Sequence, residues 1–312
     1  MIRTPTTFIV GAGGSAPYGL PVGTELHRRA KALDEGQFAH KLLAECGGQG
    51  GEFKALLEDL REHPAESIDA FLESRQESKN TLAAGKLLIA ALMADALELS
   101  RPAPGRESDW LGYVIEKMRK GAPTWDAFVK GNHRVRFITF NFDTLIEERL
   151  GTAIRAIYRG HAIDDNAILA AIPVIHVHGK LPARRGSLQP PGQASGWPSK
   201  AATSWVTKAS REINVVLDQI DPVTVNASLD AITQAAIVCF LGFAYDPDNL
   251  EHIGLPNAFG SMKKIPEVFG SAFGLLPGEC AGVHRQFLNK IELGGPGQGC
   301  REVLRALNIF RE

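Results

Sequence analysis

Short apolar runs alternate with longer amphipathic segments along this chain. The runs at 8–10, 135–140, 172–177 and 236–241 are bounded by polar or glycine residues, which is typical of buried strands. Segments with apolar residues every three or four positions separate these runs and predict helices. This alternation indicates an α/β fold: a Rossmann-like, doubly wound and mainly parallel sheet with a helical insertion or cap layer.

The helical pattern is concentrated at 26–130, a block that we interpret as an insertion or cap following the first strand. Within the block, apolar spacing predicts helices at 52–62, 65–76, 79–99 and 110–120. After it, the sequence predicts helices that begin at 144 and span 214–235, with a break at 221–222 in the second, and closing helices at 282–292 and 300–307. It also predicts strands at 153–158 and 266–273. Residues 182–204 are rich in Pro, Gly and Ser and predict an irregular loop. We expect residues 1–312 to form a single domain.

The composition is that of an ordinary globular protein, because 44% of the 312 residues are hydrophobic and 22% are charged. The formal net charge of −1 gives no sign of a surface for nucleic acid or a membrane. The apolar run at 8–10 is too short for a signal peptide, and Lys86 and Asp95 interrupt the most apolar helix, at 83–97. We therefore expect a cytoplasmic protein without a membrane segment.

Four cysteines are scattered along the chain, and none forms a CxxC pair. This spacing excludes a structural zinc site built from paired cysteines, so no metal is expected. Isolated cysteines, with Cys239 inside an apolar strand, are typical of buried thiols in a reducing cytoplasm.

A glycine-rich turn, Gly11-Ala12-Gly13-Gly14-Ser15, follows the first predicted strand. Backbone N–H groups can approach an anionic ligand closely there, because glycine has no Cβ. The turn indicates a nucleotide site, although glycine clusters are also common in tight turns without a ligand. Ala16 occupies the third glycine position of the G-x-G-x-x-G motif, and no strand end about 20 residues further on supplies a ribose-binding acid. An ordinary dehydrogenase is therefore a strained interpretation.

Polar residues also end the next two predicted strands. After the second, Asn141 could hold a ribose hydroxyl or a water and Asp143 could receive a carboxamide, but both are also preferred helix caps. On the third, His176 and His178 share one face, and His178 beside Gly179 is placed to act as a general base. The alternative is that His178 is structural, as isolated histidines usually are.

The fourth strand ends in Gly242, Phe243, Ala244, Tyr245 and Asp246. The glycine permits close approach of a ribose or adenine, and an aromatic ring could stack on a base. The alternative is a strand-ending turn with core aromatics. Because ligands bind at the carboxyl ends of parallel strands, the four motifs together predict one site at that edge of the sheet.

The segments GAGGSAPYGLPVGTEL, TFNFDTLIEE, IHVHGK and FLGFAYDPDNL occur in the order of the motifs of sirtuin-like NAD-consuming domains in bacterial antiphage defence proteins, which they resemble. The resemblance extends from Phe8 to Leu250. It implies a Rossmann-like NAD-binding core and cleavage of the N-glycosidic bond of NAD+, giving nicotinamide and ADP-ribose. NAD+ would be the substrate, and no further cofactor is implied.

The resemblance also implies roles for individual residues. The phosphate and nicotinamide-ribose side would be lined by Gly11, Ala12, Gly13 and Ser15. Asn141 would hold the ribose and the attacking water, His178 would be the base, and Asp143 would support the nicotinamide pocket. The remaining cofactor-binding residues would be Gly242 and Phe243, on the adenosine half, and Asp246.

Two departures from deacylating sirtuins affect the expected reaction. Their four-cysteine zinc module is missing from this sequence, and Phe140 stands where they usually carry a Gln. Water is therefore the expected acceptor. A protein deacylase or ADP-ribosyltransferase, and a non-catalytic NAD- or ADP-ribose-binding subunit, stay open as alternatives. Depletion of NAD+ during phage infection would need control, which we expect from homo-oligomerisation or from a separately encoded partner that senses infection.

Overall fold

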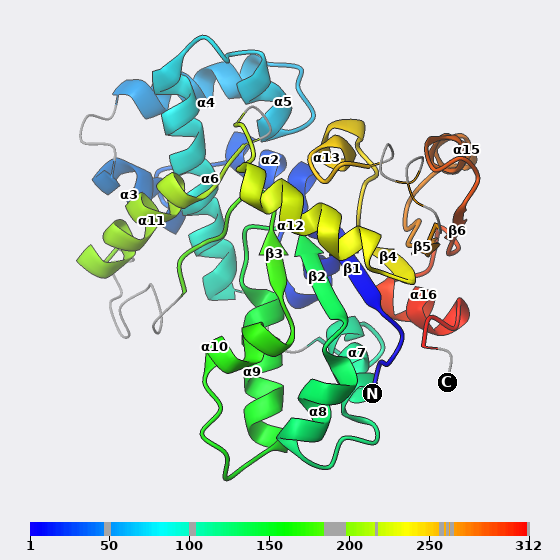
Figure 1. The fold of residues 1–312 in the computed structure, drawn as a ribbon. Helices are drawn as coiled ribbons and strands as arrows, with labels where there is room; N and C mark the ends of the chain where they lie inside the picture. Colours follow the sequence, from blue (N-terminus) through cyan, green and yellow to red (C-terminus); the bar gives the residue numbers. More distant parts are fainter. Residues whose placement is uncertain are drawn as a thin grey trace. The chain divides into compact units, whose positions relative to one another are not determined.

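The computed structural model describes residues 1–46, 51–99, 104–183, 198–215, 218–255, 259, 262 and 265–310 (Figure 1). Contacts divide the chain into two compact units. The sheet unit comprises Met1–Pro17, Ala103–Val177 and Ile220–Glu312, and the helical unit comprises Tyr18–Pro102 and His178–Gln219.

The sheet unit contains six strands in the order β3-β2-β1-β4-β5-β6, and every neighbouring pair is parallel. The strands are β1 (Thr6–Val10), β2 (Val135–Thr139), β3 (Val174–His176), β4 (Ile237–Leu241), β5 (Glu267–Gly270) and β6 (Ile291–Leu293). This order confirms the predicted Rossmann-like, doubly wound α/β fold. Every residue of β1 and β4 is buried, as expected for central strands covered on both faces.

Ten helices or helical turns accompany the sheet in the described part of this unit. They are α1 (Ala12–Ser15), η1 (Ala16–Tyr18, which ends one residue beyond the unit), α7 (Trp110–Arg119), α8 (Trp125–Asn132), α9 (Leu145–Ile157), α10 (Asp165–Ala171), α12 (Pro222–Thr233), α13 (Pro247–Glu251), α15 (Pro277–Gln286) and α16 (Cys300–Ala306).

The two faces of the sheet carry different packing partners. Ile9 and Ile138 share one hydrophobic cluster with Ile232 of α12 and residues of α13 and α15. On the other face, Phe8 stacks on Phe137 with ring centroids 5.1 Å apart. Helix α7 contacts both α9 and α16, and in Figure 1 α12 is separated from α7 and α9 by the strands. Burial of successive residues on opposite faces explains why the strands read as continuous apolar runs.

The helical unit is built around α6 (Lys79–Leu99). Its partners are α2 (Gly23–Lys31), α3 (Phe38–Cys46), α4 (Gly51–Glu62), α5 (Ile68–Glu73) and α11 (Lys200–Glu212), all of which contact α6. Among the described helices, α6 alone is long and apolar enough to cross a membrane by length and composition. Five helices pack against it, which is the arrangement of a core helix.

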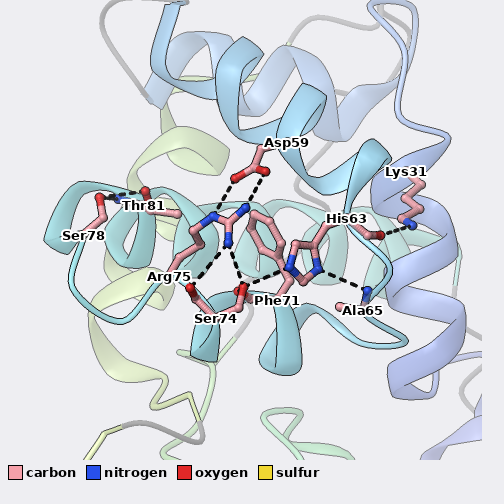
Figure 2. A network of polar contacts seen from close by, with 9 residues as sticks. All are labelled: Lys31, Asp59, His63, Ala65, Phe71, Ser74, Arg75, Ser78 and Thr81. Atoms are coloured by element: carbon pink, nitrogen blue, oxygen red, sulfur yellow. Dashed lines mark hydrogen bonds and ion pairs between the residues drawn. The ribbon is translucent and has the colours of Figure 1, made fainter.

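Figure 2 shows a polar network that links α4, α5 and the turns beside them in the helical unit. Arg75 donates two hydrogen bonds to the Asp59 carboxylate, at 2.7 and 2.9 Å. His63 lies 3.2 Å through Nε2 from Ser74 Oγ, and its Nδ1 accepts a hydrogen bond from the Ala65 N–H at 3.1 Å. These groups are exposed or half-buried, so the network fixes local geometry more than it adds stability.

Several predicted elements differ from the structure. The predicted strand at 153–158 lies inside α9, whose buried residues Ile146, Leu150 and Ile154 recur every four positions and not every two. The predicted helix at 282–292 was also wrong at its end, because α15 ends at Gln286 and Ile291–Leu293 form β6.

Two further boundaries need correction. The predicted irregular loop at 182–204 overlaps α11, which begins at Lys200 behind its N-cap Ser199, and residues 184–197 lie outside the described residues. The predicted helix over 214–235 is shorter, because α12 begins only after the Asp221 side chain caps it.

Candidate functional site

The carboxyl ends of three central strands lie level with one another in the sheet unit. Val10 pairs with Thr139 on one side and with Leu241 on the other, and each of these is the last residue of its strand. The loops after β1, β2 and β4 therefore begin at the same edge. The strand order also reverses between β1 and β4, which is the position where open α/β sheets bind ligands.

The loops after β1 and β4 are in direct backbone contact. Gly11 N–H donates to Leu241 O at 3.0 Å, and Gly13 N–H donates to Gly242 O at 2.9 Å. A Cβ at Gly11 would lie 2.6 Å from Gly242 O, and one at Gly242, where φ is 59°, would lie 2.0 Å from Gly14 N. The packing of the two loops, with no side chains between them, therefore requires these glycines whether or not a ligand binds.

The helix after the glycine-rich turn is only one turn long. Ala12 is its first residue, Gly11 is its N-cap, and a 3-10 turn follows Ser15. A single turn has a small dipole, so any anion bound here would depend mainly on individual N–H groups. Trp110 holds this turn in place, because its indole N–H donates to Gly14 O at 2.7 Å.

Three of the predicted site residues form one buried hydrogen-bonded chain. The Asn141 side-chain amide donates to Ser15 Oγ at 2.8 Å, and the Ser15 hydroxyl donates to Asp143 Oδ2 at 2.8 Å. All three residues are at least nine-tenths buried. Ser15 thus meets residues 126 and 128 positions further along the chain, at the carboxyl edge of β1 and β2.

The hydrogen bonds of Asn141 determine what its side chain can offer a ligand. Besides the bond to Ser15, Nδ2 donates to Gly11 O at 3.0 Å, so both amide hydrogens are used within the unit. The part of the amide not used in these two bonds is the carbonyl oxygen Oδ1. Asn141 is therefore oriented as an acceptor, suited to a hydroxyl group or a water molecule.

Asp143 is a carboxylate in an apolar setting. Burial raises the pKa of its carboxyl above the ordinary value, and the hydrogen bond from Ser15 opposes that rise. Its second oxygen accepts from the Leu145 N–H at 3.1 Å, at the start of α9. Asp143 thus accepts a backbone hydrogen bond at the start of α9, beside the N-cap Thr144, and at the same time orients Ser15.

The backbone of Asn141 is also fixed on both sides. Its N–H donates to Thr139 Oγ1 at 3.1 Å, and its carbonyl lies 3.1 Å from His176 Nδ1. The other ring nitrogen of His176 lies 2.8 Å from Glu147 Oε1 of α9. The His176–Glu147 pair is largely buried, with 6% and 13% of the two side chains exposed.

The loop after β4 contributes mainly structural residues. Phe243 is buried among aromatic rings, with its centroid 5.0 Å from Phe140 and 5.4 Å from Phe240. Asp246 is exposed and caps α13, accepting from the Asn249 N–H at 3.1 Å. These contacts are those of a strand-ending turn with core aromatics, the alternative considered for this motif.

Residues that sequence reasoning missed hold the same loop. Ser271, directly after β5, accepts the Gly242 N–H through Oγ at 2.8 Å and receives the Tyr245 hydroxyl on its carbonyl at 2.9 Å. Tyr245 has a φ of 59°, which is uncommon for a non-glycine residue. The sequence could have identified Ser271 as a polar residue directly after a fifth strand.

His178 belongs to the helical unit, whereas Ser15, Asn141 and Asp143 belong to the sheet unit. It comes two positions after the end of β3 and is 6% exposed. Its carbonyl accepts the Asn214 N–H at 2.7 Å, and the neighbouring Gly179 forms a bridge to Ile213. The predicted role of His178 as a base stays a prediction.

Comparisons with known proteins add no family assignment. No protein-family model matches the sequence, and none of the curated proteins matches it. Within the described ranges, no three or more His, Cys, Asp or Glu residues are grouped so as to hold a metal ion.

Proposed function

We propose that this protein is an NAD+ hydrolase, which uses water to cleave the bond between nicotinamide and ribose. The observation that carries the proposal is the buried chain Asn141–Ser15–Asp143 at the switch point of a 3-2-1-4-5-6 sheet. That position suits a dinucleotide, and the chain presents an oriented acceptor next to it. The four ordered motifs that resemble sirtuin-like domains support the same activity.

The proposed reaction converts NAD+ and water into nicotinamide, ADP-ribose and a proton. Asn141 Oδ1 would accept a hydrogen bond from the ribose or from the attacking water, which places the oxygen near the ribosyl carbon. Ser15 and Asp143 would keep the Asn141 amide in this orientation. His178 would take the proton that the attacking water releases.

The physiological role follows from the activity and the resemblance. Cleavage of NAD+ in the cytoplasm would deplete the cofactor and stop phage multiplication at the cost of the infected cell. Such an enzyme must be inactive in uninfected cells. Self-assembly into a homo-oligomer, or a separately encoded partner that senses infection, would supply this control.

The direct test is release of nicotinamide from NAD+ by the purified protein, alone and with the products of neighbouring genes. We expect Asn141→Ala to slow release about 100-fold, because it removes the oriented acceptor. His178→Ala should slow it comparably. Asn166→Ala, which changes an exposed Asn on α10, is the matched control and should leave the rate unchanged.

The products separate the proposal from its alternatives. Free ADP-ribose in amounts equal to nicotinamide supports hydrolysis. ADP-ribose attached to protein, or loss of an acyl group matched to nicotinamide release, would instead establish a transferase or deacylase. Binding of NAD+ without turnover under every partner condition would show a non-catalytic subunit.

A further inference from the structure

We propose that His176 is a positioning residue for Asn141, held in its protonated, cationic form by Glu147. We infer the protonation state from the two contacts of the imidazole ring and from the ionised form of Glu147. The effect on catalysis rests on the proposed NAD+ hydrolase activity. The sequence motifs give His176 no role of its own, beyond a strand face shared with His178.

The position of His176 in the sheet explains which residues it meets. Its strand neighbours Ile175 and Val177 join the hydrophobic cluster that includes α12, so His176 projects from the opposite face. There it meets Glu147, in the first turn of α9. Register also places His176 beside Thr139, two residues before Asn141.

The partners of the ring determine its protonation. Nδ1 lies 3.1 Å from the Asn141 carbonyl, which can only accept, so Nδ1 must carry a hydrogen. Nε2 lies 2.8 Å from a carboxylate oxygen of Glu147. Against an ionised Glu147, a bare Nε2 would set two lone pairs against each other at that distance. An imidazolium that donates from both nitrogens satisfies both contacts.

The charged groups around the ring favour the same state. Glu147 on α9 is the direct partner, and Asp143, in the loop between β2 and α9, interacts electrostatically with both His176 and Glu147. One cation therefore lies among two buried carboxyl groups. Removing it would leave these carboxylates facing each other in a medium where like charges repel strongly.

The consequence concerns the geometry of Asn141. Its side chain is held by Gly11 and Ser15, and its N–H by Thr139. His176 completes this set by fixing the carbonyl. If the carbonyl is released, the peptide can rotate and Oδ1 moves with it. A misplacement of about 1 Å at a reacting group can cost about 100-fold in rate.

The kinetic test compares four variants at one neutral pH. His176→Ala and Glu147→Ala should lower kcat for nicotinamide release about 100-fold while KM changes little. Glu147→Gln should restore most of kcat, because its amide can donate to an unprotonated Nε2 and leave Nδ1–H on the Asn141 carbonyl. Glu148→Ala, an exposed neighbour on α9, is the control for Glu147→Ala.

The comparison of Glu147→Gln with Glu147→Ala gives a readout that a merely structural role would not move. Glu147→Gln should recover kcat while KM stays the same in both variants. Equal kcat in Glu147→Gln and Glu147→Ala would overturn the proposal, as would an undiminished kcat in His176→Ala.

Nitrogen-15 NMR of histidine side chains tests the protonation state without any enzyme activity. The chain has 9 histidines, and the His176 signals are assigned by their loss in His176→Ala. Both ring nitrogens should be protonated at neutral pH in wild type. A neutral ring with a bare Nε2 would overturn the inference even if NAD+ is hydrolysed. A protonated ring in a protein that never releases nicotinamide would instead refute the proposed function alone.

Discussion

At the scale of single residues, Asp143 lowers the stability of the fold through its buried carboxylate and also orients a residue of the candidate site. Its carboxyl is buried, its pKa is raised chiefly by that burial, and it accepts hydrogen bonds from Ser15 and Leu145. We expect Asp143→Asn to raise the free energy of unfolding at neutral pH by about 1 kcal/mol, because a neutral amide is cheaper to bury. Nicotinamide release should fall at least about 10-fold, because Ser15 loses its carboxylate acceptor.

The destabilisation caused by the Asp143 carboxylate should depend on pH, in a direction set by its raised pKa. A raised pKa in the folded state means that the folded protein binds a proton at pH values where the unfolded chain does not. The cost of the buried carboxylate is therefore complete above the folded pKa, and it declines as the pH falls toward the ordinary value of 3.8. Urea unfolding should show the gap between wild type and Asp143→Asn closing on acidification. Asp230→Asn, an exposed change on α12, should show no gap. A gap that widens in acid would contradict the argument.

At the scale of elements, the two loops at the switch point depend on glycine for their mutual packing. Gly242→Ala would place a Cβ 2.0 Å from Gly14 N and hold a left-handed backbone on a residue that disfavours it. We expect a loss of about 2–5 kcal/mol in the free energy of unfolding, from strain and overpacking together. Urea denaturation followed by circular dichroism measures it.

A second glycine provides the control for this prediction. Gly278 in α15 has no atom within 4 Å of the position that a Cβ would occupy. Gly278→Ala should therefore leave stability unchanged or raise it by less than about 1 kcal/mol. Equal losses in the two variants would show that the contact between the loops does not determine the cost.

The elements that the sequence predicted well were those with one clear periodicity. The buried run at 236–241 and the 21-residue helix α6 were found almost to the residue. The strand predicted at 153–158 failed because six residues are too few to separate the two periods, and the spacing of three between Ile154 and Ile157 is in fact helical. Strand β6 was missed because three residues with one exposed side chain carry no usable pattern.

The candidate site was predictable in part for a similar reason. Strand ends can be read from the sequence, which therefore predicts Ser15, Asn141 and Asp143 at one edge of the sheet. Their hydrogen bonds could not be read, because they join residues brought together only by the parallel register of β1 and β2. The contact between Glu147 and His176 could not be predicted, because an acidic residue in the first turn of a helix is already explained by its favourable interaction with the helix dipole.

At the scale of the whole molecule, the two compact units contain buried ionisable groups of opposite pH response. In the helical unit, His27 of α2 is 7% exposed, and burial, followed by the charge of Lys31, lowers its pKa. The unfolded chain then binds a proton near the ordinary value of 6.5 while folded His27 does not. Stability is therefore lost as the pH falls below that value. In the sheet unit, protonation of Asp143 in acid removes the destabilisation that its buried carboxylate causes.

Hydrogen exchange resolves the two units in one experiment. Between about pH 7.5 and about pH 5.5, exchange corrected for intrinsic rates should increase in α2 and α6 and change little in β1, β2 and β4, because the proton acts where it binds. His27→Leu keeps the site apolar and removes the titrating group, so the increase in α2 and α6 should disappear. His161→Leu, an exposed change in the sheet unit, should leave it intact. If acid increased exchange equally in the strands and in α6, the two units would be opening as one, and the assignment of acid sensitivity to His27 would fail.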